Sequence, residues 1–149
     1  MSEQGKPIFL GNFGEILLTW HLRSKFKINV AIVKGKGIDL LCKDNEGMLL
    51  PKNQNIGISV KTRARKKENN LESVNIEWEK IKSACSSWGA IPYFSYIRIV
   101  PEYGTITFYL LEVSKAEQWG KQFHVTKAEK SIKPLFEMKF DQYTVLSDW

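Results

Sequence analysis

The sequence predicts a single α/β domain in which a helix, three strands, a second helix and further strands follow one another. The length of 149 residues is that of one domain with its own core. Hydrophobic residues make up 43% of the chain and charged residues 26%, as in ordinary globular proteins. The spacing of the apolar residues changes along the chain from a helical period to the alternation of strands.

The first helix is expected at about residues 13–25. Apolar residues recur at i, i+3, i+4 and i+7 as Phe13, Ile16, Leu17 and Trp20, and this stripe is expected to face the core. Asn12 precedes the stripe, so it is a candidate N-cap. Glu15 lies off the stripe and three residues after Asn12, where an acid can complete a capping box.

Three strands are expected next. Alternating apolar residues indicate a first strand at 28–32, and the Lys-Gly-Lys-Gly sequence at 34–37 predicts a turn into a second strand at 38–43. Residues 44–55 have no strong pattern and are expected to form a loop. Ile56, Ile58 and Val60 alternate in a third strand, which places Ser59 and Lys61 on its opposite face.

The second half of the chain predicts a helix at 75–88 and strands at 91–100 and 105–113, joined by a turn at 101–104. A capping box at 114–117 is expected to open a short helix toward residue 121, and 136–146 is expected to form a last strand. The aromatic residues in and around the strand pair are expected to pack in the core, with base stacking by one or two of them as the alternative. They are Trp88, Tyr93, Phe94, Tyr96, Tyr103, Phe108 and Tyr109.

An acid and a lysine stand out in the second and third strands. Asp39 begins one apolar run and Lys61 lies near the end of the next. If the runs form a hairpin, the two side chains lie side by side, where Asp39 is suited to ligate a metal and Lys61 to position a water or a phosphate. The structural alternatives are a strand-end aspartate that accepts backbone hydrogen bonds and a lysine on an exposed sheet face.

Asp39 and Lys61, with Glu15 on a preceding helix, resemble the PD-(D/E)xK nuclease superfamily, in particular its Holliday-junction-resolvase-like branch, from about residue 10 to 113. The resemblance implies a restriction-endonuclease-like αβββαβ core, with a mixed sheet flanked by helices and extra C-terminal strands. It also implies Mg²⁺- or Mn²⁺-dependent hydrolysis of DNA by a homodimer, since a four-way junction needs two cuts. Glu15 and Asp39 would hold the metal, and Lys61 would orient the attacking water.

Ser59 departs from this family pattern, which has a second acid two residues before the lysine. Either catalysis is lost and the protein only binds nucleic acid, or another residue supplies the acid, as a helix glutamate does in some restriction enzymes of the superfamily. Glu77 falls about 40° from the middle of the second helix's apolar stripe, whereas Glu79 falls on the opposite side. Glu77 is therefore the candidate third ligand, although a solvated first-turn acid is the alternative. The Ser59 hydroxyl or the Val60 carbonyl would complete the metal shell.

The charge distribution suggests a polyanionic partner. The net charge is +6, and five of the seven residues at 61–67 are basic. In the nuclease interpretation, Arg63, Arg65, Lys66 and Lys67 bind the phosphates of DNA next to the metal site. A solvated charged loop is the alternative.

The remaining features favour a cytoplasmic protein. Cys42 and Cys85 are expected to be buried thiols, and the chain has no cysteine pattern typical of zinc. His21 and His124 are expected in surface or capping roles. No apolar run is long enough to cross a bilayer, and residues 1–11 lack a signal-peptide pattern. Two other classes stay open: an inactive nuclease-fold protein that acts as a nucleic-acid-binding or assembly module, and an interaction protein in which Asp39 and Lys61 form a structural ion pair.

Overall fold

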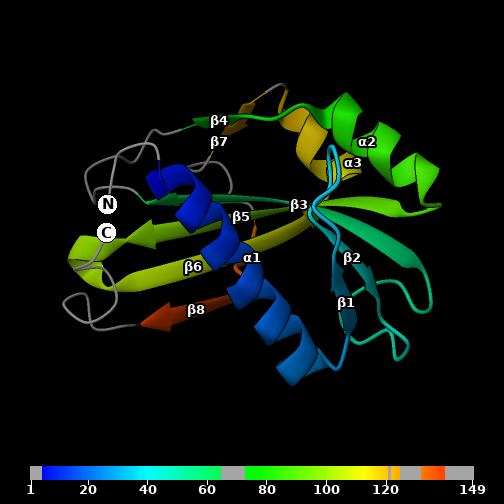
Figure 1. Cartoon of the computed structure of the whole chain (residues 1–149), viewed down its shortest axis with the longest axis horizontal. Coiled ribbons are helices and arrows are strands. Elements are labelled where there is room, and N and C mark those ends of the chain that lie inside the picture. Colours follow the sequence, from blue (N-terminus) through cyan, green and yellow to red (C-terminus); the bar gives the residue numbers. More distant parts are fainter. Residues whose placement is uncertain (1–4, 65–72, 121, 125–131, 140–149) are drawn as a thin grey trace.

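A six-stranded mixed sheet forms the centre of the molecule (Figure 1). The computed structural model describes residues 5–64, 73–120, 122–124 and 132–139. The strands lie in the order β1 (Asn29–Ile32), β2 (Leu40–Lys43), β3 (Asn55–Ala64), β5 (Ile91–Val100), β6 (Thr105–Glu112) and β8 (Phe136–Lys139). β3 and β5 are parallel, whereas the other neighbours are antiparallel. A separate two-stranded ribbon pairs β4 (Ser73–Asn75) with β7 (Gln122–His124).

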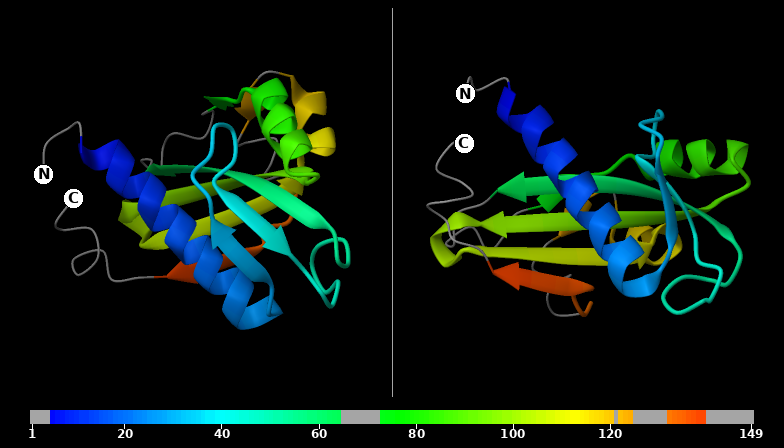
Figure 2. Two further views of the ribbon diagram at one scale, coloured as in Figure 1. Left: turned by 45° about the vertical axis from the view of Figure 1, so that its right-hand side comes forward. Right: turned by 60° about the horizontal axis from the view of Figure 1, so that its bottom comes forward.

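Helices cover both faces of the sheet (Figure 2). α1 (Gly5–Phe26) crosses one face, where its Leu18 and Leu22 pack with the apolar side chains of β1, β2 and β3. α2 (Trp78–Ser87) and α3 (Val113–Ala116) pack on the other face, and the 3-10 turns η1 (Pro101–Tyr103) and η2 (Glu117–Trp119) follow β5 and α3. Because a parallel pair of strands needs a crossover, β4 and α2 connect β3 to β5. No helix in the described part of the chain combines the length and apolar character needed to span a bilayer.

The first helix is longer than expected, and it buries a different face. α1 begins at Gly5, so Asn12 lies within the helix, and the expected capping box of Asn12 and Glu15 is wrong. Ile16 and Trp20 are 58% and 56% exposed, while Glu15 is only 8% exposed. The apolar stripe that was expected to face the core therefore lies partly in solvent.

Gly14 explains this orientation of α1. A β-carbon at Gly14 would overlap the Thr62 hydroxyl on β3, so only glycine lets the helix approach the strand this closely. The close approach turns the neighbouring Glu15 toward the sheet and leaves Ile16 outside. α1 is therefore oriented by one backbone contact rather than by its apolar stripe.

β3 is covered on both faces. Ile56, Ile58 and Val60 are buried under α1, as their alternation predicted. On the opposite face, a β-carbon at Gly57 would lie 2.5 Å from the Cys85 sulfur of α2. The helix therefore lies directly over this face, which contains the position of Ser59.

Several boundaries differ from the expected ones. The second helix begins at Trp78 rather than at 75, because residues 73–75 form β4. The capping box at 114–117 is wrong: Glu112 occupies the N-cap of α3 and makes no side-chain capping bond, and Ser114 lies inside the helix. β5 has the expected bounds. The last strand is observed at Phe136–Lys139, and the rest of its expected range lies outside the described residues.

The aromatic and sulfur-containing side chains follow the expectations in part. Phe94, Tyr96, Phe108 and Tyr109 are buried, but Trp88 and Tyr103 are exposed, so the core assignment is wrong for those two. His21 is buried, and its ring stacks on that of Phe136 with the two ring centroids 3.4 Å apart. Its expected surface or capping role is therefore wrong.

Cys42 and Cys85 are buried thiols as expected. Burial raises their pKa values to about 12 and about 11, so both stay protonated at neutral pH.

Candidate active site

Asp39 lies directly before β2, where the chain changes from one face of the sheet to the other. Ile38 packs in the core under α2, whereas Leu40 packs in the core under α1. Residues two apart in a regular strand share a face, so the backbone turns at Asp39. The Asp39 N–H donates to the Ile58 carbonyl at 2.9 Å, and the Val60 N–H donates to the Asp39 carboxylate at 2.8 Å. These bonds hold the carboxylate against β3.

Glu15 reaches Asp39 from α1, and their side chains share a hydrogen bond. Burial, followed by the negative charge of Asp39, raises the pKa of Glu15 from 4.5 to about 6. The positive charge of Lys34 partly opposes this rise in the Glu15 pKa. Asn12 accepts a hydrogen bond from the Lys34 ammonium at 2.7 Å, which places this cation on the same side of α1. The two carboxylates thus form a close pair that favours a proton or a cation.

Asp39, Ser59, Lys61 and Glu77 line one pocket of about 440 Å³. Its walls come from the start of β2, from β3 and from the residues that lead into α2. Lys61 is half-buried in this wall and makes no ion pair with Asp39. This finding counts against the interpretation of the two residues as a structural ion pair. Lys61 and Asp39 instead both line the same pocket.

Glu77 and Glu79 differ in what they contact. Glu77 occupies the N-cap of α2, lines the pocket and pairs with Lys80 at 3.5 Å, with 76% of its side chain exposed. Glu79 pairs with Lys82 at 2.7 Å and is 89% exposed. Within the described residues, no three His, Cys, Asp or Glu side chains lie close enough together to hold a metal ion. In this conformation, Glu77 therefore stands apart from the pair of Glu15 and Asp39.

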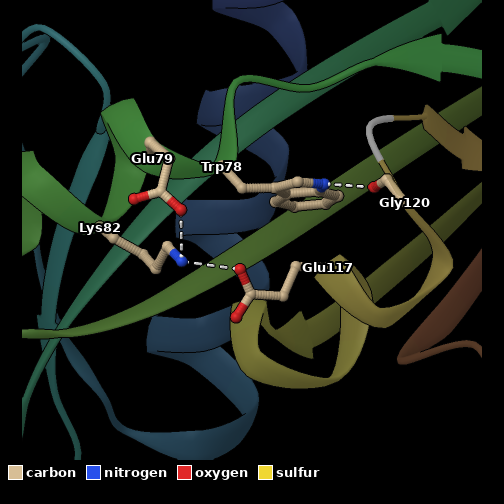
Figure 3. A network of polar contacts seen from close by, with 5 residues as sticks. All are labelled: Trp78, Glu79, Lys82, Glu117 and Gly120. Atoms are coloured by element: carbon tan, nitrogen blue, oxygen red, sulfur yellow. Dashed lines mark hydrogen bonds and ion pairs between the residues drawn. The ribbon is translucent and has the colours of Figure 1, made fainter.

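The start of α2 is fixed by contacts with the segment that follows α3 (Figure 3). The Lys82 ammonium donates to the Glu117 carboxylate at 2.8 Å and also contacts Glu79. Both hydrogen bonds raise the pKa of Lys82, and the bond to Glu117 has the larger effect. The Trp78 indole N–H donates to the Gly120 carbonyl at 2.7 Å. These contacts hold the helix that forms one wall of the pocket.

The basic run is described only in part. Arg63 is half-buried in β3, and its guanidinium donates to the Thr62 carbonyl at 3.0 Å. Arg65, Lys66 and Lys67 lie outside the described residues.

Asp44 is a second buried acid, which the sequence did not distinguish from an ordinary loop residue. Its carboxylate accepts hydrogen bonds from the N–H groups of Glu46, Gly47, Leu49 and Leu50 at 2.9–3.2 Å. Burial alone would raise the pKa of Asp44, but the four hydrogen bonds together lower it. Both of its oxygens are used to hold the loop, so its role is structural. The Asp-x-x-Gly order at 44–47 is the sequence signal that was available for this turn.

The mixed sheet with helices on both faces has a restriction-endonuclease-like fold, as the sequence predicted. No protein-family model and no curated protein matches the chain. Among solved structures, the chain is similar to Hjc, a Holliday junction resolvase from Archaeoglobus fulgidus, an archaeal hyperthermophile. The sequence identity is 19%, the match covers 76% of this chain and 86% of that one, and the TM-score is 0.50. At this identity the likeness shows the fold, so any activity has to be argued from the residues of the site.

Proposed function

We propose that the protein is a metal-dependent DNA endonuclease, with branched DNA such as a four-way junction as its substrate class. The carboxylate pair of Glu15 and Asp39, next to the pocket that contains Lys61, is the observation that carries this proposal. The fold shared with a Holliday junction resolvase supports the choice of branched DNA as the first substrate to test. Two cuts across a junction would require a homodimer.

The donor set suits Mg²⁺ or Mn²⁺. Two adjacent carboxylates, one of which holds a proton up to about pH 6, supply the oxygen ligands that these ions prefer. Glu15 and Asp39 would hold the ion, with the Ser59 hydroxyl, the Val60 carbonyl or a reoriented Glu77 as further ligands. When bound, the ion would polarise the phosphate and lower the pKa of water in the site.

The protein's own residues have separate tasks in this proposal. Asp39, fixed by the Val60 N–H, provides a rigid carboxylate at the edge of the pocket. The Lys61 ammonium orients the attacking water and stabilises the negative charge that develops on the phosphate. Arg63, Arg65, Lys66 and Lys67 contact the phosphates on either side of the cut.

Two substitutions test this proposal. Asp39→Ala should abolish cleavage while DNA binding stays intact or becomes tighter, because a negative charge near the phosphate is removed. Lys61→Ala should also stop cleavage, yet leave measurable affinity for the metal. The measurement is cleavage of four-way, linear and single-stranded DNA with Mg²⁺ and with Mn²⁺. Unchanged cleavage by either variant would count against the assigned roles.

A catalytically inactive nuclease-fold protein that binds nucleic acid is the second candidate function. Two observations favour it: Ser59 stands where the family has an acid, and the described residues contain no group of three metal-ligating side chains. The same experiment separates the two candidates. Wild-type protein that binds DNA but leaves every substrate uncut with Mn²⁺ would establish the binding function.

A further inference from the structure

A second pocket, of about 670 Å³, lies between the C-terminal end of α1 and the strands β1 and β2. Three cationic side chains line it, Arg23, Lys27 and Lys43, together with the amides of Asn29 and Asn55. Within the described part of the chain, no aspartate or glutamate lines this pocket. The chemistry of this pocket therefore favours an anion that can accept several hydrogen bonds.

Lys27 occupies a backbone position that favours glycine. It directly follows α1 with φ at 57°, in the left-handed region where a β-carbon is disfavoured. The N–H groups of Lys27 and Ile28 donate to the carbonyls of Arg23 and Leu22 at 3.2 and 3.1 Å, which completes the end of the helix. A cation at a helix C-terminus is one structural reason to have lysine here. Lys27 also lines the same pocket as two further cations, Arg23 and Lys43, so binding of an anion is a second reason to have lysine here.

Three segments of the chain, α1, residues 39–43 and β3, each have one residue at or beside the candidate active site and another that lines this pocket. On α1, Arg23 follows Glu15 by eight residues, which is about 12 Å along a helix. Lys43 is the last residue of β2 and follows Asp39, which directly precedes this strand, by four residues, or at most about 13 Å of extended chain. On β3, Asn55 precedes Ser59 by the same number of residues. Along these segments the basic pocket thus lies up to about 12–13 Å from the candidate active site.

A DNA strand rises about 3.4 Å per nucleotide along the helix axis and also winds around it, so phosphates about 12–13 Å apart on one strand are separated by no more than about three nucleotides. We propose that the pocket is a second phosphate-binding site, which holds the backbone of a DNA duplex within about three nucleotides of the phosphate that is cut. This inference rests on the proposed function and deepens it. Lys27 and Lys43 contact the phosphates, and Arg23, whose guanidinium already donates to the Val30 carbonyl at 2.5 Å, directs its other N–H groups toward them.

The test is DNA binding without cleavage, in EDTA, over a range of salt concentrations. The double variant Lys27→Gln/Lys43→Gln loses two phosphate contacts, so the slope of log K against log salt should fall by about 1.8. Affinity at 0.1 M salt should fall by about tenfold or more. The matched control is Lys115→Gln/Lys133→Gln, which removes the same charge from a different pocket beside β6. The control should change the slope by much less.

The variant Lys27→Gly separates binding from folding. Glycine fits the left-handed position, so the midpoint of thermal unfolding should stay the same or rise, while the salt slope falls by about 0.9. A purely structural role of Lys27 predicts the reverse: lower thermal stability and an unchanged slope. If wild-type protein binds DNA and the Lys27/Lys43 variant binds equally well, this second site is refuted while the proposed function stands. If wild-type protein does not bind DNA at all, both fail.

Discussion

The position of Glu15 in the fold opposes the ionisation of its own carboxyl group. Glu15 is buried next to Asp39, and both its burial and the negative charge of Asp39 make a second negative charge on Glu15 unfavourable. The folded protein therefore holds a proton on Glu15 more tightly than the unfolded chain does. The stabilisation that this proton gives is complete below about pH 4.5 and is lost as the pH rises through about 6.

Glu15→Gln should therefore stabilise the metal-free protein at pH 8, by up to about 2 kcal/mol, which is the free-energy equivalent of the pKa difference between 4.5 and about 6. At pH 4.5 the gain should vanish. Burial lowers the pKa of His21, so His21 makes the protein more stable as the pH rises, whereas Glu15 makes it less stable. The contribution of Glu15 is therefore obtained as the difference in the free energy of urea unfolding between wild type and Glu15→Gln at each pH. A difference that does not change between pH 4.5 and pH 8 would contradict this description of Glu15.

The two glutamates around the start of α2 provide a second residue-scale test. Rotation of Glu77 toward Asp39 breaks only an exposed ion pair with Lys80, which costs about 1 kcal/mol or less. Glu77→Gln should then reduce the cleavage rate by about a hundredfold or more, while Glu79→Gln stays near the wild-type rate. Ser59→Glu in the Glu77→Gln background should restore part of the rate, because it returns the acid to β3. Equal rates for both single variants would remove Glu77 from the site.

Some of the site was predictable from individual residues and some was not. Asp39 attracted notice because an acid at the start of an apolar strand has no role in packing, and Lys61 because it follows on the next strand. The burial of Glu15 was not predictable, since it depends on the contact of Gly14 with Thr62, which lies 48 residues further along the chain. The Asp-x-x-Gly order at 44–47 indicates a turn, but it does not reveal that four backbone N–H groups donate to the Asp44 carboxylate.

At the scale of whole elements, the position of α1 decides whether Glu15 reaches Asp39. The apolar residues of α1 surround the helix, so their pattern did not identify the buried face, and the missing side chain of Gly14 sets it instead. β5 was predicted with its observed bounds because apolar residues are frequent over all its ten positions. The alternation of Ile56, Ile58 and Val60 located β3, but the polar and basic residues 61–63 of this strand carry no apolar pattern. β4 and β7 have three residues each and depend on pairing with each other, so no local pattern could predict them.

Gly14→Ala tests this positioning of α1. The new methyl group meets Thr62, so the helix must move, and we expect a loss of about 1–3 kcal/mol in the free energy of unfolding together with slower cleavage. Gly11→Ala is the matched control, because a β-carbon at Gly11 has no neighbour within 4 Å. It should stabilise the helix by about 1 kcal/mol and leave cleavage unchanged. A gain of stability in both variants alike would mean that helix propensity, not the contact with β3, dominates.

At the scale of the whole molecule, the site is assembled from both sides of the sheet. Glu15 comes from the helix on one face, the wall with Glu77 from the helix on the other, and Asp39 and Lys61 from the strands between them. The order of elements, together with Glu15, Asp39 and Lys61, resembles the nuclease superfamily, and this resemblance predicted the restriction-endonuclease-like fold. Which acids complete the site depends on side-chain positions that the order of elements does not determine.

Calorimetric titration of Mn²⁺ into the protein between pH 5 and pH 8, with cleavage of a four-way junction measured in parallel, tests the carboxylate pair most directly. Wild-type protein should bind Mn²⁺ and cut the junction, and its affinity should fall below about pH 6, where a proton on Glu15 competes with the ion. Glu15→Gln and Asp39→Asn should each lose binding and cleavage together. Mn²⁺ binding or cleavage that persists in both variants would show that Glu15 and Asp39 are not the metal-binding pair.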